Sequence, residues 1–125
     1  MSNTPEVVLA AFLEAFSRLD VEALVAHFAP TATAFFPGEH QRTRLEGKEA
    51  IARAFEAVAA RFRLKGATNM ALDAQDVVAQ EWDDTAVVTF QLRGEHLSRR
   101  TLVLRRDAGS WQIVHMHASN AAVDR

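Results

Sequence analysis

GSWQIVHMHASNA, residues 109–121, is the stretch that decides the fold of this chain. It follows the turn-like sequence RRDAG, residues 105–109, and we expect it to form the last strand of a sheet. Side chains alternate between the two faces of a strand, and neither face here is simply polar. The two alternating sets are Trp111, Ile113, His115, His117 and Ser119, and Gln112, Val114, Met116 and Ala118. We therefore expect cover on both sides of this strand, from the protein's own helices and from a second subunit.

Length and composition indicate one soluble globular domain, residues 1–125, with 49% hydrophobic and 24% charged residues. The formal net charge of −2 provides no basic field for nucleic acid, so no nucleic-acid partner is expected. The chain has no cysteine, which excludes disulfides and thiolate chemistry. Neither a signal-peptide pattern nor a long apolar run is present, so we expect a cytoplasmic protein without membrane association.

Helical signals occupy the first half of the chain. Thr4 is suited to cap a first helix that reaches about Arg18, and Asp20 to cap a short second helix that ends before Pro30. A β-prone stretch, residues 32–36, and a polar loop, residues 39–46, come next. Gly47 then opens a third helix. Apolar residues recur at helical spacing along this third helix: Ile51, Ala54, Phe55, Val58 and Phe62.

Strand signals follow Gly66. We expect a bent strand over residues 70–80, a turn at 82–84, and strands over 85–93, 96–106 and from 110 onward. Gly94-Glu95 suits a two-residue hairpin turn. Helices followed by an antiparallel meander indicate the α+β class, with helices on one side of a curved sheet.

Three stretches carry a resemblance to a known superfamily: FLEAFSRLDVEALVAHFAPTAT (12–33), LEGKEAIARAF (45–55) and RRDAGSWQIVHMHAS (105–119). Together they resemble the nuclear transport factor 2-like superfamily, in particular its SnoaL-like and ketosteroid-isomerase-like members. The last stretch is also similar to the association domain of calcium/calmodulin-dependent protein kinase II. The resemblance implies a cone-shaped fold, with three N-terminal helices on the concave face of a curved mixed or antiparallel sheet. Members are usually dimers or higher oligomers and include isomerases, dehydratases, cyclases, epoxide hydrolases and non-catalytic scaffolds, so the fold alone does not give the function.

The polar groups that such relatives use for catalysis do not carry over. The position of the ketosteroid isomerase base falls on Phe36, and the tyrosine positions fall on Phe12, Phe28 and Phe55. Phenylalanine neither takes a proton nor donates a hydrogen bond to an oxyanion, so we expect this isomerase mechanism to be absent. The aspartate of scytalone-dehydratase-like members falls near Ser17. The cavity arginines of the kinase association domain fall on Thr101 and Ala118, so its anion pocket is not expected either.

The remaining rings and the sheet predict an apolar cavity. If Arg93 pairs with His96 and Arg106 with Trp111, then Phe90, Arg99, Thr101 and Val103 share a face with the even-numbered residues of the last strand. The resemblance makes that face the concave one. Arg99 would then be its one charged group, with Thr101 and Gln112 as polar anchors. The predicted ligand-binding residues are Phe12, Phe16, Phe28, Phe36, Phe55, Phe90, Arg99, Thr101, Gln112, Val114 and Met116.

The histidines allow several interpretations. On the same register, His115 and His117 lie on the convex face with Trp111 and Ile113, and these four residues are expected to form a homodimer interface. A metal site is the alternative for the two histidines, but no third ligand is evident, so we expect no metal and no cofactor. His27 is a weak candidate for an acid or base, as is Arg99 for a catalytic group.

The sequence thus favours a homodimeric protein that binds a small apolar molecule. Two alternatives stay open. One is a lyase, isomerase or hydrolase acting on a small hydrophobic substrate of polyketide or terpene type. The other is a non-catalytic oligomerisation module.

Overall fold

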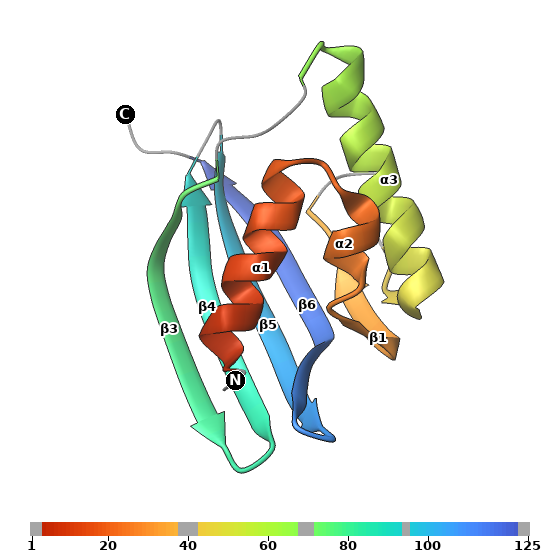
Figure 1. Cartoon of the computed structure of the whole chain (residues 1–125). Helices are drawn as coiled ribbons and strands as arrows, with labels where there is room; N and C mark the ends of the chain where they lie inside the picture. Colours follow the sequence, from red (N-terminus) through yellow and green to blue (C-terminus); the bar gives the residue numbers. More distant parts are fainter. Residues whose placement is uncertain (1–3, 38–42, 68–71, 94–95, 123–125) are drawn as a thin grey trace.

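A curved, open sheet with helices on one of its faces forms the body of the protein (Figure 1). The computed structural model describes residues 4–37, 43–67, 72–93 and 96–122. Helices α1 (Pro5–Ser17), α2 (Val21–Val25) and α3 (Lys48–Leu64) come from the first half of the chain. The sheet contains β1 (Phe28–Phe35), β2 (Leu45–Glu46), β3 (Ala74–Trp82), β4 (Thr85–Arg93), β5 (His96–Asp107) and β6 (Ser110–Ala122). The expected α+β class and the N-terminal position of the helices are confirmed.

The strands lie in the order β2-β1-β6-β5-β4-β3. Every neighbouring pair is antiparallel except β1 and β6, which run parallel, so the sheet is mixed. The parallel pair brings the first strand of the chain beside the last, and it places β6 in the middle of the sheet. Helix α1 lies across the sheet in front of β4 and β5, while α3 lies beside β1 (Figure 1).

Local capping chemistry explains where the helices begin. The Thr4 hydroxyl accepts a hydrogen bond from the Val7 N–H at 3.2 Å, and the Asp20 carboxylate accepts one from the Ala23 N–H at 3.1 Å. Both expected caps are therefore confirmed. Gly47 precedes α3 with a φ of 93°, a backbone conformation that only glycine adopts without strain.

Three boundaries differ from the expectations. Phe28 begins β1 rather than ending α2, because α2 stops at Val25. Leu45 and Glu46, expected in a loop, pair with Ala34 and Thr33 as the short edge strand β2. Trp82 belongs to β3 rather than to the turn. Parts of three expected segments lie outside the described residues. They are the start of the strand expected from residue 70, the hairpin residues 94 and 95, and residues 39–42 of the expected loop.

The sheet has an inner face, which the helices cover, and an outer face, which they do not. The inner face carries the core side chains of the strands: Ala86, Val88, Phe90, Leu92, Leu102, Leu104, Ile113, Met116 and Ala118. All of these are buried, and most pack with apolar residues of α1, α2 and α3 in one cluster. Along each strand, the residues between these core positions point to the outer face.

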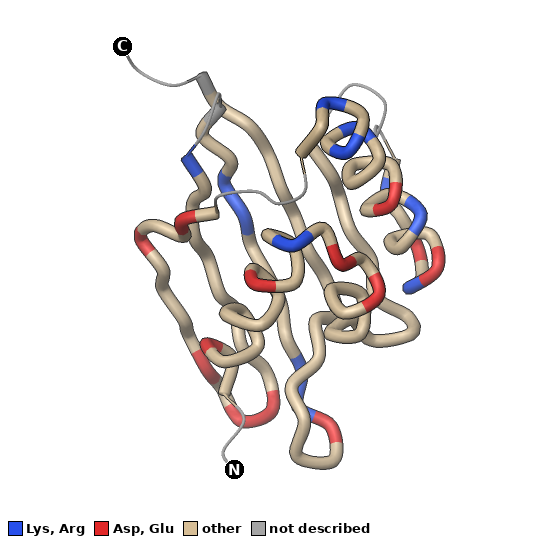
Figure 2. The backbone as a smooth tube through the Cα atoms, turned by 45° about the horizontal axis from the view of Figure 1, so that its top comes forward, with Lys and Arg blue, Asp and Glu red and all other residues tan. Residues whose placement is uncertain are grey.

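Charged residues are interleaved rather than gathered. Figure 2 shows basic and acidic positions following one another along α3 and near the ends of the strands. No helix of the described chain is both long and apolar enough to cross a membrane.

Candidate functional site

Five phenylalanine rings meet between the helices and the inner face. They are Phe12 and Phe16 of α1, Phe28 of β1, Phe36, which follows β1, and Phe55 of α3, and we call them the phenylalanine cluster. Phe55 lies at its centre, with ring centroids 4.7 Å from Phe36 and 5.5 Å from Phe16. The other paired rings are 6.0–6.2 Å apart, and most pairs have edge-to-face geometry. The rings expected to line a cavity therefore pack against one another as part of the core.

Seven of the expected ligand-binding residues lie in this interior. Besides the phenylalanine cluster, Phe90 and Met116 are buried on the inner face of the sheet. Their positions agree with the sequence reasoning, because burial of large apolar rings is what the helical and strand periodicities predict.

The register of the hairpin between β4 and β5 differs from the expected one by a single residue. Arg93 pairs with Leu97 rather than with His96, so Arg100, not Arg99, lies opposite Phe90. A slip of one residue exchanges the two faces of a strand. Arg99 and Thr101 are consequently on the outer face, and the expectation that they line the interior is wrong.

A second shift occurs in β6, where a bulge lies between the pairs Leu104–Ile113 and Val103–His115. Trp111 and Ile113 are buried and belong to the core, so they are not the outer-face residues expected for a dimer interface. Gln112 alternates with them and lies on the opposite face, which removes it from the interior. Val114 lies at the bulge and packs only partly against the core.

Arg100 is a charged residue that the register places on the inner face, between Phe90 and Ala118. Its Nε donates a hydrogen bond to Ser98 Oγ at 3.2 Å, and its guanidinium carbon lies 5.5 Å from the centre of the Phe16 ring. The nitrogen Nη1 is buried and has no hydrogen-bond partner among the described residues. Burial lowers the pKa of Arg100 to about 10. The sequence reasoning missed this residue because two adjacent arginines, Arg99 and Arg100, lie on opposite faces and only the register distinguishes them.

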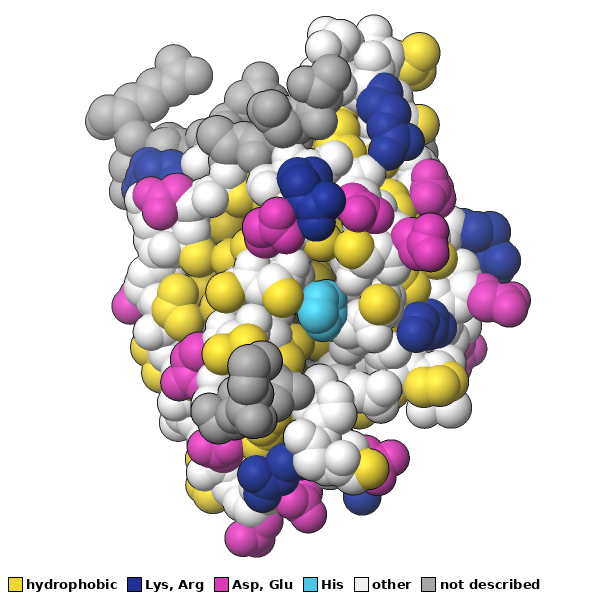
Figure 3. Space-filling view, in the orientation of Figure 1, with side chains coloured by type: hydrophobic (Ala, Val, Ile, Leu, Met, Phe, Trp, Pro, Cys, Tyr) yellow, Lys and Arg dark blue, Asp and Glu magenta, His cyan; other side chains and the backbone are white. Residues whose placement is uncertain are grey.

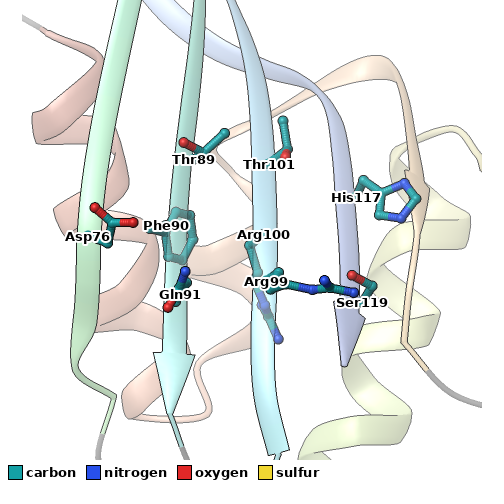
Figure 4. A pocket seen from close by; sticks show the side chains of 9 residues that line it. All are labelled: Asp76, Thr89, Phe90, Gln91, Arg99, Arg100, Thr101, His117 and Ser119. Atoms are coloured by element: carbon teal, nitrogen blue, oxygen red, sulfur yellow. The ribbon is translucent and has the colours of Figure 1, made fainter. Parts of the chain in front are cut away.

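Arg99 lines a shallow pocket of about 210 Å³ on the outer face (Figure 4). In Figure 4 its side chain extends across the sheet toward Ser119, whereas that of Arg100 runs along its own strand. The outer-face side chains of the pocket are Thr89, Gln91, Arg99, Thr101, His117 and Ser119, with Asp76 at its rim. Phe90 and Arg100 also line this pocket, but its outer-face side chains are polar, so it lacks the ring-lined wall that was expected around Arg99.

Two of the candidate histidines also lie on the outer face. His115 Nδ1 is 2.8 Å from Thr33 Oγ1, and the His115 and His117 rings lie 5.9 Å and 5.5 Å from the ring of Phe35. Partial burial, together with repulsion from His117 and Arg44, lowers the pKa of His115 despite the opposing effect of Thr33. Within the described residues no three potential ligands gather as a metal site would need.

His27 follows α2 and is half-buried, and this burial lowers the pKa of its imidazole. Its carbonyl oxygen accepts a hydrogen bond from the Ile113 N–H at 2.8 Å, which ties the start of β1 to β6. The helix-bearing side of the molecule shows apolar and charged side chains in alternation (Figure 3). Among the described residues none of the buried ones is polar or charged, so no Asp, Glu or His lies within the phenylalanine cluster.

A family model described as the SnoaL-like domain matches residues 6–124, nearly the whole chain. The chain belongs to the SnoaL-like domain family. The resemblance found in the sequence is thereby confirmed. No curated protein gives a significant match.

Solved structures agree on the fold of this SnoaL-like protein. A dehydratase candidate of the NTF2-like family from Streptomyces avermitilis is 22% identical, with a TM-score of 0.78 over 94% of both chains. A candidate calcium/calmodulin-dependent protein kinase type II association domain from Thiobacillus denitrificans is 24% identical, with a TM-score of 0.76 over 97% of this chain and 98% of the other. A ketosteroid isomerase-like protein from Erwinia carotovora atroseptica is 25% identical, with a TM-score of 0.74 over 94% of both. At these identities the likeness concerns the fold.

Proposed function

We propose that this SnoaL-like protein binds a small organic molecule between its helices and the inner face of its sheet. The observation that carries the proposal is the Nη1 nitrogen of the partly exposed Arg100, which is buried and has no hydrogen-bond partner among the described residues, beside an otherwise apolar interior. Apolar walls with one or a few oriented polar groups are the usual composition of a small-molecule site. The ligand would displace or rearrange rings at the edge of the phenylalanine cluster, next to Phe16.

Binding is favoured over catalysis because the described interior offers no group to move a proton. General acid–base catalysis needs a titratable side chain within hydrogen-bond reach of the reacting atom. The described buried set contains no such side chain, and Arg99, a catalytic candidate from the sequence, lies on the other face of the sheet. A dehydratase or isomerase activity, which the names of two structural neighbours suggest, would need a base from elsewhere.

Nuclear magnetic resonance of the phenylalanine rings tests the proposal directly. With ring-labelled phenylalanine, we expect a panel of small aromatic and aliphatic molecules, neutral and anionic, to include members that shift the Phe12 and Phe16 resonances. Phe35 is the internal control, because its ring lies with His115 and His117 on the outer face. Ligand-induced shifts at Phe35 alone, or none at any ring, would contradict the proposed site.

We also propose that two copies of the chain pair through the outer face, as the sequence suggested. Support comes from the apolar side chains that this face leaves in solvent: Val78 is 47% exposed and Trp82 56% exposed, both on β3. Phe35 and Val103 are partly exposed on the same face. The interface now proposed keeps His115 and His117 but excludes Trp111 and Ile113, which are in the core.

This pairing should weaken in acid. The pKa of His115 in the folded protein lies below the ordinary value of 6.5, so the unfolded chain binds the proton more tightly. The contribution of neutral His115 to folding stability is therefore fully present above about pH 6.5, the ordinary pKa. It is lost as the pH falls from there through the lower pKa of the folded protein. A second subunit that covered His115 would lower its pKa again, and protonation would then also oppose the pairing.

Sedimentation velocity at pH 8 and pH 5.5 measures this dependence. We expect a dimer at pH 8 and a shift toward monomer at pH 5.5, and the substitution His115→Gln should reduce the shift because glutamine does not titrate. The side chains of His117 and Arg44, which both act on the pKa of His115, stay in place in that variant. An unchanged sedimentation coefficient between the two pH values would count against the proposed interface.

A further inference from the structure

Among the described residues the guanidinium of Arg100 has no anionic partner. The ion pairs within the described residues join Arg18 to Glu14 and Asp20, and Arg106 to Asp84, and all of these are on the surface. Arg100 instead has one hydroxyl acceptor, Ser98 Oγ, and the face of the Phe16 ring. A buried charge without a counter-charge is costly, and proteins keep one mainly where something else neutralises it.

The surroundings of Arg100 restrict what that partner can be. Across the sheet it lies opposite Phe90 on one side and Ala118 on the other, both buried, and Phe16 lies over it from α1. No second basic residue of the described inner face lies among these neighbours, so a dianion such as a phosphate monoester would keep an unneutralised charge. A ligand with one negative charge and an apolar body matches Arg100 and the apolar side chains around it.

The orientation of the guanidinium further limits which anionic group can bind. Its Nε is engaged by Ser98 Oγ, which leaves the two Nη nitrogens to act together, and Nη1 is already excluded from solvent without a partner. Two parallel N–H donors fit the two oxygens of a carboxylate, and such paired charge-assisted bonds are among the strongest in proteins. Ser98 is then a positioning residue, which fixes the plane of the guanidinium.

We propose that the ligand of this protein is a small apolar monocarboxylate, whose oxygens accept hydrogen bonds from the Nη atoms of Arg100 while its hydrocarbon part lies against Phe16 and Phe90. This inference rests on the proposed function and names the ligand class for the same site. It differs from the sequence-based expectation of a small apolar ligand with Arg99 in its site, because the register places Arg100 rather than Arg99 on the inner face. The charge remains at neutral pH, because burial lowers the pKa of Arg100 only to about 10.

Calorimetric titration with matched acid and amide pairs tests the ligand class. The probes are phenylacetate with phenylacetamide, hexanoate with hexanamide, and benzoate with benzamide. We expect the unmodified protein to bind at least one acid about tenfold or more tightly than its amide. The substitution Arg100→Met, which keeps much of the length and apolar stem, should remove that preference. Arg99→Met is the matched control, because Arg99 is the adjacent residue on the outer face and its loss should leave the preference intact.

A thermal melt without ligand adds a readout that a purely structural role would not produce. Arg100→Met should raise the melting temperature, since it replaces a charged group whose buried Nη1 has no partner among the described residues by an apolar side chain of similar length. Arg99→Met should leave it nearly unchanged. The acid should raise the melting temperature of the unmodified protein and of Arg99→Met, but not of Arg100→Met.

The possible failures are distinguishable. Equal affinities for an acid and its amide, with Phe16 resonances shifting for both, would overturn the carboxylate proposal and leave small-molecule binding in place. An acid preference that survives Arg100→Met, or a lower melting temperature of that variant without ligand, would also overturn it. If no probe binds and the wider panel shifts no ring resonance, both the carboxylate proposal and the proposed small-molecule binding are contradicted.

Discussion

Replacing Phe55 by alanine is expected to lower the free energy of unfolding by about 3–5 kcal/mol, the usual range for truncation of a buried phenylalanine. Phe55 packs against the rings of Phe12, Phe16, Phe28 and Phe36, so its removal opens a gap at the point where α1, β1 and α3 meet. The four remaining rings, which are packed against one another, cannot all move to fill that gap without losing their own contacts. For a domain of this size the melting temperature should fall by roughly 10–20 °C.

Urea unfolding followed by circular dichroism measures the loss. Phe62→Ala is the matched control, because Phe62 lies two turns further along α3 but is only partly buried. Its loss should cost clearly less than that of Phe55, about 1 kcal/mol if half of its ring area is removed from water. Similar effects of the two substitutions would mean that the phenylalanine cluster does not hold α3 in place.

The helices could be predicted from the sequence because their signals are local. Thr4 and Asp20 each cap a helix three residues before the N–H that they bind, and the apolar stripe of α3 repeats every three to four residues. These interactions form within one or two turns and depend little on the rest of the chain. The burial of Phe12 and Phe55 follows from the same periodicity.

The face of each strand could not be predicted with the same success. In β5 both alternating sets are partly apolar, with Leu102 and Leu104 in one and Val103 in the other, so the pattern does not choose between them. The expected register depended on the hairpin pairing of Arg93, which the structure shifts by one residue, and the β6 bulge shifts the phase again. Both shifts are set by contacts between strands. This is why Arg100 was overlooked and Arg99 placed in the interior.

The register itself leads to the last prediction, which compares two adjacent residues of β5. Leu102 is fully buried on the inner face opposite Val88, whereas Val103 lies on the outer face opposite Val87 and His115. Leu102→Asp should cost more than about 5 kcal/mol, because it removes a core side chain and buries a carboxyl group without a partner. That is enough to unfold a domain whose total stability is about 5–15 kcal/mol.

Val103→Asp should leave the fold intact, since its carboxylate reaches solvent on the outer face of a single subunit. Far-ultraviolet circular dichroism and urea unfolding of the two variants provide the comparison, and sedimentation of Val103→Asp shows whether the outer face pairs two copies. A folded Leu102→Asp beside an unfolded Val103→Asp would restore the register that the sequence suggested. In that case Arg99 would face the interior in place of Arg100, and the carboxylate site would have to be sought around Arg99. The stability of these two variants therefore decides which arginine can hold the ligand.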